Sequence, residues 1–383
     1  MNVRLTISRV AKPVISLCLM FTLTVSSISG QIQTEKYRDM TLEEAVVSTD
    51  MKGWSARKAE RWYDRLPFLA GCNYIPRNAV NQIEMWQQKT FSPEIIDEEL
   101  GWAEQLGFNT LRVFLQSTVW KADPEGYKQR VDQFVEIADR HGMKTMLVIF
   151  SGAGGIDNKL GHQSEPIPGC HNRFFCGDPD LLPDGSEDLE SYPLMERYVK
   201  QLMKKFGRDK RVLAWDLWNE PGWRNHKGTT SFDLMTKVVC WVRSMKPSQP
   251  LTIGVWNTDL VNLNHFIFAV SDIVSFHTYS EQHEVLTMLA ERYKPVGRPI
   301  ICTEYMARTF HCYFDTVLTL FKAERVGAIS WGLVDGKMNT KWPWHWEGGA
   351  EEPQPWFHDV LHPDGTPYDA REAKFIRQLL RGK

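Results

Sequence analysis

The feature that most constrains this chain is a series of eight short apolar runs separated by longer segments, most of which contain a helical stretch. Strands of a parallel sheet that is covered on both faces have this continuous apolar character, because neither face meets water. The pattern therefore predicts a parallel sheet between two layers of helices. The runs are "FLAGCNY" (68–74), "TLRVFLQ" (110–116), "KTMLVIF" (144–150), "VLAWDLWN" (212–219), "LTIGVWN" (251–257), "DIVSFHTY" (272–279), "PIICTEY" (299–305) and "GAISWGLV" (327–334).

Amphipathic helical stretches lie between many of these runs, and several end at a glycine, a common helix stop. Eight strands alternating with helices close into a (β/α)8 TIM barrel, a fold of about 250 residues. A doubly wound open sheet is the alternative, but no glycine-rich phosphate loop follows the first run. "SGAGGIDN" (151–158) follows the third run without a helix after it, so we interpret it as a substrate loop. Long loops are predicted after strand three (151–190) and strand eight (335–367).

The first 30 residues have the pattern of a secretory signal peptide, with basic residues before a short apolar stretch from Val14 to Val25. A lipoprotein anchor at Cys18 is disfavoured, because Leu17 stands where a small residue is expected. We therefore expect a secreted or periplasmic protein with a signal peptide (1–30), an N-terminal helical extension (31–65) and a catalytic domain (66–383). No segment is long and apolar enough to predict a membrane span.

Composition argues against some classes of partner and does not decide the chemical state of the cysteines. The formal net charge of −2 gives no reason to expect nucleic acid or an anionic membrane as a partner. Cys170 and Cys176 bracket "CHNRFFC" and form the best disulfide candidate for an exported chain. With His171 they could instead bind zinc, but the spacing fits no common zinc pattern, so no metal and no cofactor are predicted.

Two acids stand at the carboxyl ends of predicted strands, where a barrel keeps its active site. "WDLWNEP" (215–221) places Asn219 and Glu220 after the fourth strand, and "TEY" places Glu304 at the end of the seventh. Each alone could be an ion-pair partner. Together they supply the two carboxyl groups that glycoside hydrolysis needs, one to protonate the leaving oxygen and one on the other side of the anomeric carbon.

These motifs resemble glycoside hydrolase clan A, most closely the cellulase-like enzymes around glycoside hydrolase family 5. The likeness covers about residues 66–380 and rests on "LRVF", "WNEP", "FHTY", "TEY" and "SWG" at the ends of strands two, four, six, seven and eight. It implies a retaining reaction on a β-linked glycan, with Glu304 as nucleophile and Glu220 as acid/base. One departure is that Phe150 stands where many family 5 enzymes carry a histidine, which puts a typical cellulase subfamily in doubt.

Other residues are assigned supporting roles in the same pocket. Arg112 can hold Glu304 ionised, Asn219 can bind the sugar 2-hydroxyl, and Trp331 can stack under the sugar. Tyr279 can donate to Glu304. His277 can tune the acid or contact substrate, and the alternative is a satisfied histidine of the barrel wall. Asn73, Glu84 and Trp86 are expected to contact distal sugar units or to close the pocket. Asp335 and Lys337 follow Trp331 closely and are candidate polar contacts.

The loop after strand eight contains Trp342, Trp344, Trp346 and Trp356, of which one or two are expected to contact substrate. The alternatives to a glycosidase are a non-catalytic carbohydrate-binding barrel and a metal-dependent barrel hydrolase. The intact acid pair disfavours the first, and the scarcity of histidines at strand ends disfavours the second. The sugar (mannan, xylan or glucan), endo or exo action and the oligomeric state stay open.

Overall fold

The computed structural model describes residues 51–151, 158–180, 188–222 and 231–382. The predicted signal peptide, the first part of the predicted extension and most of the glycine-rich loop (residues 152–157) lie outside the described residues.

The eight apolar runs all form strands, and every strand residue except Lys144 is buried. The strands are β1 (Ala70–Asn73), β2 (Thr110–Phe114), β3 (Lys144–Ser151), β4 (Val212–Asn219), β5 (Leu251–Thr252), β6 (Gly254–Val255), β7 (Val274–His277), β8 (Ile300–Glu304) and β9 (Gly327–Ser330). Only the fifth run differs from the prediction, because it is divided into β5 and β6.

All strand pairs are parallel, in the order β5-β4-β3-β2-β1-β9-β8-β7-β6. β5 pairs with β4 and β6 pairs with β7, so the ring of strands closes through the single residue between them, Ile253. The predicted (β/α)8 barrel is confirmed, and the doubly wound alternative is wrong.

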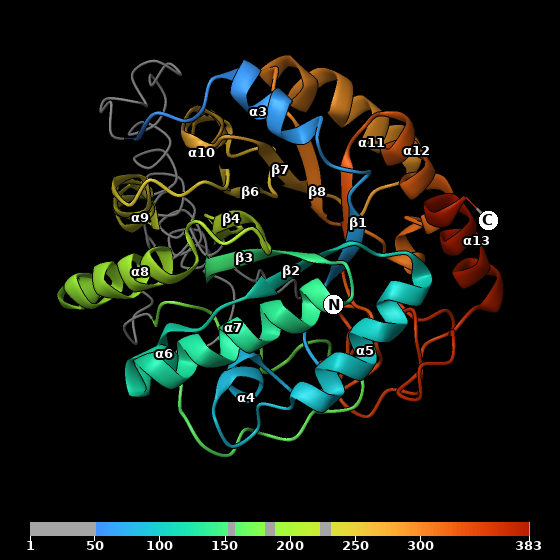
Figure 1. Ribbon diagram of the computed structural model, residues 1–383. Coiled ribbons are helices and arrows are strands. Elements are labelled where there is room, and N and C mark those ends of the chain that lie inside the picture. Colours follow the sequence, from blue (N-terminus) through green and yellow to red (C-terminus); the bar gives the residue numbers. More distant parts are fainter. Residues whose placement is uncertain (1–50, 152–157, 181–187, 223–230, 383) are drawn as a thin grey trace, which may run out of the picture. The chain divides into compact units, whose positions relative to one another are not determined.

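Helices surround the strands, as Figure 1 shows for α5, α7 and α8. The helices are α3 (Ala56–Tyr63), α4 (Gln82–Trp86), α5 (Pro93–Leu106), α6 (Ser117–Ala122), α7 (Pro124–Arg140), α8 (Tyr192–Phe206), α9 (Ser231–Ser244), α10 (Val261–Val270), α11 (Gln282–Met288), α12 (Thr319–Ala323) and α13 (Ala370–Arg381). Among the described residues, no helix combines the length and hydropathy that crossing a bilayer requires.

Local sequence explains where the helices begin and end. α7 begins at Pro124, whose missing N–H is harmless there, and the Asp123 carboxylate accepts a hydrogen bond from the N–H of Gly126 at 3.0 Å. α5 ends at Gly107, whose φ of 93° lies in the left-handed region that glycine adopts readily.

The amino-terminal end of the barrel is closed by α3. Tyr63 of this helix joins a buried apolar cluster formed by residues near the starts of the strands, and its hydroxyl donates to the carbonyl of Arg325 at 3.0 Å. The other buried members of the cluster are Leu69, Met146, Leu213, Ala214, Ile273, Ile301 and Ile329. Because a helix fills this end, the opposite end is left for the long loops and the site.

Candidate active site

The two predicted acids meet at the carboxyl end of the barrel. Glu304 is the last residue of β8, and Glu220 directly follows β4. One side-chain ligand atom from each of Glu220, His277 and Glu304 lies within 4.8 Å of the other two. Parallel strands bring their carboxyl ends to one rim, which explains how residues so distant in sequence become neighbours.

The backbone at Glu220 is strained. Its φ is 48°, in the left-handed region that a residue with a Cβ seldom occupies, and Gly222 two residues later has a φ of 83°. Strained backbone of this kind often marks functional sites, where the surrounding structure holds it in place. This turn directs the Glu220 carboxyl back over the mouth of the barrel, where it meets His277.

Arg112 of β2 is the central cation of the site and is completely buried. It donates from Nη1 to Glu304 Oε1 at 2.9 Å and to Asn73 Oδ1 at 2.9 Å. It also donates from Nη2 to Asp216 Oδ2 at 2.8 Å and to Asn219 Oδ1 at 2.7 Å. A planar guanidinium with five fixed donors suits this set of acceptors, because it can serve several in-plane directions at once.

Asp216 is a functional residue to which the sequence interpretation gave no role. It is completely buried within β4, and its Oδ2 also accepts from Arg112 Nε at 3.0 Å. The signal was present in the sequence, since an acid inside an apolar strand must find a cation or hydrogen-bond donors. Asp216 and Glu304 together balance and fix the guanidinium.

His277 and Tyr279 complete the contacts of the acid pair. Nδ1 of His277 lies 2.8 Å from Glu220 Oε1 and 3.6 Å from Glu304 Oε2. The Tyr279 hydroxyl donates to Glu304 Oε2 at 2.8 Å. The Nε2 of His277 is buried without a partner, and a Cβ on Gly254 would approach it to 3.2 Å. These contacts favour a proton on Nδ1 that is donated to Glu220.

Burial shifts the pKa values of Glu220 and His277 in opposite directions. It raises the pKa of Glu220 to about 7, against the opposing charge of Arg112. It lowers the pKa of His277 to about 4, so this ring is neutral near neutral pH. Glu220 therefore has the pKa of a group that can give and take a proton near neutrality.

Burial also raises the pKa of Glu304, and the nearby Glu220 acts in the same direction. His277, Arg112 and the hydrogen bond from Tyr279 lower it. The expected contact from Arg112 to Glu304 is present, but burial outweighs it in the net shift of this pKa. Because the two acids are close, their titrations belong to the pair as a whole.

A cavity of about 1090 Å³ opens above the acid pair. Strand ends contribute Asn219, His277 and Glu304, and Trp331 follows β9. The loop after β3 contributes residues 158–159, 162–164 and 171–176, so the "CHNRFFC" segment forms part of the wall. The cavity is large enough for more than one sugar unit, and it joins the acids to the predicted aromatic platform at Trp331.

Comparison with known families decides what this barrel is. The sequence model of the cellulase family, glycosyl hydrolase family 5, matches residues 78–336. The chain belongs to glycosyl hydrolase family 5. It is therefore a glycosidase, as the motifs at the strand ends predicted. No curated protein matches this chain significantly by sequence.

Solved structures with the same fold include other members of this family. An exo-β-1,4-mannosidase from Opitutaceae bacterium strain TAV5 matches with a TM-score of 0.59 at 14% identity, over 88% of this chain and 62% of that one. This chain thus spans less than two thirds of that protein. A family 5 enzyme from Streptomyces cattleya, in complex with Manβ1-4GlcNAc, has a TM-score of 0.54 at 13% identity, over 82% and 80% of the two chains.

An endo-1,4-β-D-mannanase from Thermotoga petrophila RKU-1 also matches, with a TM-score of 0.51 at 13% identity, over 83% of this chain and 100% of that one. At such identities the likeness shows the fold alone. The sugar that this family 5 chain cleaves must therefore be sought in its own loops.

The tryptophans of the loop after β9 divide between packing and the cavity. Trp344 is 43% exposed, lines the cavity and packs edge-on against Tyr279, with 4.9 Å between ring centroids. Trp342 and Trp356 are buried, and Trp356 stacks on Tyr368 at 4.4 Å. Trp346 is exposed but does not line the cavity. Trp256, which follows β6, lines the cavity as well and was not predicted.

Two expected sugar contacts are wrong for reasons of burial. Trp86 has no exposed surface, donates from Nε1 to the Phe114 carbonyl at 2.7 Å and packs among aromatic rings of the helical layer. Asn73 is 6% exposed, and its amide donates to the carbonyls of Thr303 at 2.7 Å and Ser330 at 3.1 Å. With its oxygen on Arg112, Asn73 has its hydrogen-bonding groups engaged by protein and supports the guanidinium.

Three charged residues expected at the pocket lie outside the large cavity. Glu84 accepts from the N–H of Val80 at 2.7 Å and pairs with Lys337 at 3.4 Å. Asp335 pairs with Lys341 at 2.8 Å. None of the three lines the cavity above the acids. The first pair joins α4 to the loop after β9, and the second lies within that loop.

Phe150 and the cysteines also have structural positions. Phe150 is buried against Tyr198 of α8 and Trp218, while the next residue, Ser151, accepts from Asn219 Nδ2 at 3.3 Å. Cys170 and Cys176 are both free, so the proposed disulfide is not formed.

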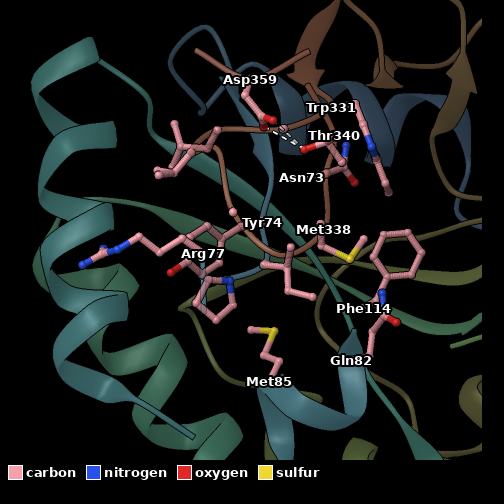
Figure 2. A pocket seen from close by; sticks show the side chains of 16 residues that line it. Asn73, Tyr74, Arg77, Gln82, Met85, Phe114, Trp331, Met338, Thr340 and Asp359 are labelled. Atoms are coloured by element: carbon pink, nitrogen blue, oxygen red, sulfur yellow. Dashed lines mark hydrogen bonds between the residues drawn. The ribbon is translucent and has the colours of Figure 1, made fainter. Parts of the chain in front are cut away.

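A second, much smaller cavity of about 30 Å³ is also lined by Trp331. Figure 2 shows Asp359 and Thr340 on its wall together with Asn73 and Phe114. The Thr340 hydroxyl lies 2.8 and 2.9 Å from the two Asp359 oxygens, and burial raises the pKa of Asp359 to about 7. The space suits about one water molecule and no sugar.

Among the described residues, the acid pair and His277 form the one group whose ligand atoms are close enough to hold a metal ion. The surroundings do not favour this, because the Arg112 guanidinium contacts Glu304 at 2.9 Å and its positive charge would repel a cation. The donor set therefore fits acid/base and nucleophilic chemistry better than metal binding.

Proposed function

We propose that this family 5 enzyme hydrolyses β-glycosidic bonds in a glycan with retention of configuration, by double displacement. The observation that carries the proposal is the short separation of the acids, whose nearest oxygens lie within 4.8 Å. Retaining glycosidases hold their carboxyl groups about 5–5.5 Å apart, whereas inverting enzymes need about 6.5–9.5 Å to admit a water molecule.

Glu304 is proposed as the nucleophile. Arg112 and Tyr279 each donate to one of its two oxygens, which fixes the carboxylate and favours its ionised form. In the first step an oxygen of Glu304 bonds to the anomeric carbon as the bond to the leaving oxygen breaks. The result is a glycosyl ester on Glu304.

Glu220 is proposed as the acid/base. Its raised pKa keeps a substantial fraction protonated near neutral pH, and it gives this proton to the leaving oxygen. In the second step it takes a proton from a water molecule that attacks the anomeric carbon, and Glu304 leaves as a free carboxylate. The neutral His277, at 2.8 Å, orients the Glu220 carboxyl throughout.

The proposed substrate is a β-linked polysaccharide or oligosaccharide of mannan, xylan or glucan type. The large cavity, with Trp331, Trp344 and Trp256 on its wall, supports this class because aromatic faces pack on the apolar faces of pyranose rings. We also propose that the chain is exported by residues 1–30, which the mass of the mature protein tests.

Proton NMR of the first product tests the reaction directly. With an activated aryl β-glycoside, we expect the β-anomer to appear first. Glu304→Gln should abolish turnover, and Glu220→Ala should recover part of its rate in azide with a β-glycosyl azide as product. Glu136→Gln, which changes an exposed acid of α7, is the matched control and should leave the rate unchanged.

An α-anomer as first product would exclude the retaining mechanism. Binding of glycans without turnover in the wild-type enzyme would instead favour the carbohydrate-binding barrel.

A further inference from the structure

Charge is distributed unevenly on the wall of the large cavity. Among the described residues that line it, the only acids are Glu220 and Glu304. Lys159, His162 and Arg173 also line it, and all three come from the loop after β3. The chain as a whole has a net charge of −2, so the basic side chains that this loop brings to the wall do not follow from composition.

Arg173 is held in place by its neighbours in the chain. The N–H of Asn172 donates to the Met338 carbonyl at 2.8 Å, and the N–H of Phe175 donates back to the Asn172 carbonyl at 3.0 Å. The Phe175 ring packs edge-on against Phe114, with 5.3 Å between centroids. These contacts close a turn around Arg173 and fix its backbone on the cavity wall.

The side chain of Arg173 is exposed, and no described acid pairs with it. Asp178, the nearest acid of the same loop in sequence, is buried and accepts from the N–H of Ser117 at 2.7 Å, and Glu165 lies 3.7 Å from Lys337. A guanidinium facing a cavity without a carboxylate partner keeps its donors available for a ligand. Its planar pair of N–H groups matches a carboxylate, which it can bind through two parallel hydrogen bonds.

We propose that this wall binds the carboxylate of a uronic acid carried by the glycan, with Arg173 as the principal contact. The inference rests on the proposed glycosidase function and specifies its substrate class. An acidic glycan would otherwise be repelled by the carboxylate of the catalytic pair, and a positive wall offsets that repulsion. The side-chain amide of Asn172, which also lines the cavity, can serve a remaining sugar oxygen.

Competitive inhibition tests this proposal without knowledge of the natural sugar. The probes are two acidic oligosaccharides, a β-1,4-xylan fragment and a β-1,4-mannan fragment, each bearing a glucuronic acid branch. Each is compared with its carboxyl-reduced form, which differs only in charge and in the donor and acceptor pattern at one carbon. Hydrolysis of a neutral aryl β-glycoside is the readout.

We expect at least one acidic probe to inhibit about tenfold more strongly than its reduced form, with an advantage that declines as salt screens the pair. Arg173→Ala should remove this advantage, measured as the ratio of the two inhibition constants within the variant, and Arg173→Lys should keep only part of it. Arg371→Ala, which removes an exposed arginine of α13 remote from the cavity lining, is the charge-matched control.

The proposal is overturned if neither acidic probe inhibits better than its reduced form, or if Arg173→Ala keeps the difference. Failure of the general glycosidase function would look different, because hydrolysis of the neutral glycoside would then survive Glu304→Gln.

Discussion

At the scale of single residues, Arg112 organises the site. One guanidinium contacts two carboxylates and two side-chain amides that come from β1, β4 and β8, and no water reaches it. Removing one partner from a buried ion pair leaves an uncompensated charge, which costs about 3–5 kcal/mol. The position of the Glu304 carboxylate, the proposed nucleophile, and the stability of the barrel therefore depend on the same side chain.

Substitution of Arg112 tests this dependence. We expect Arg112→Met to lower the free energy of unfolding by about 3–5 kcal/mol in denaturant titrations. Arg112→Lys keeps the charge but cannot serve four acceptors, so kcat/KM should fall by about a hundredfold or more. An Arg112→Lys enzyme with near-normal kcat/KM would show that the guanidinium geometry does not matter. Arg371→Lys on the surface is the matched control.

The decline of kcat/KM at high pH is expected to follow the loss of the proton from Glu220. Because burial raises its pKa to about 7, the proton needed for the first step is present below that pH and is lost above it. We expect kcat/KM to decline as pH rises through about 7. With an activated leaving group that needs no protonation, Glu220→Gln should lose this declining limb. A limb that persists in Glu220→Gln would assign it to another group.

Sequence sufficed to predict that the two acids at strand ends lie together, and it failed for Asn73 of β1 and for residues between the strands. Glu220 and Glu304 were found because parallel strands bring their carboxyl ends together. Trp86 was misplaced, since its loop folds into the short helix α4, which turns the ring into the helical layer. Burial of a loop residue depends on contacts from distant segments, which no local pattern records.

At the scale of elements, the fifth apolar run shows that a local pattern does not predict how a strand pairs with its neighbours. "LTIGVWN" reads as one strand, yet it pairs as β5 and β6 on either side of Ile253. Gly254 begins β6 where the His277 ring approaches, and a Cβ there would lie 3.2 Å from Nε2. By contrast β4 has the predicted bounds 212–219, because a continuous run of buried residues defines it.

The loop after β9 has two kinds of tryptophan, which a pair of substitutions separates. Trp344→Ala should raise KM by about five- to tenfold with little change in stability, because the ring lines the cavity. Trp356→Ala should lower the free energy of unfolding by about 3–5 kcal/mol and leave KM unchanged, because its ring is buried.

Kinetics and denaturant titration of both variants provide the check. The assignment of Trp344 to binding and Trp356 to packing is wrong if Trp344→Ala lowers stability without changing KM. It is also wrong if Trp356→Ala changes KM in a fully folded enzyme.

At the scale of the whole molecule, the two ends of the barrel differ in what they contain. α3 and the apolar cluster near the starts of the strands close one end, while the acids, Arg112 and the long loops occupy the other. The order of apolar runs was enough to predict this architecture. The choice of sugar was not predictable, because it depends on the shapes of the loops after β3 and β9, which the strand pattern does not determine.

Trapping of the covalent intermediate tests the central claim most directly. The enzyme is incubated with a 2-deoxy-2-fluoro glycoside that carries an activated leaving group, digested, and mapped by mass spectrometry. The account predicts one added glycosyl group per chain, attached to Glu304. A label on Glu220 or elsewhere, or turnover that proceeds with inversion and leaves no label, would contradict it.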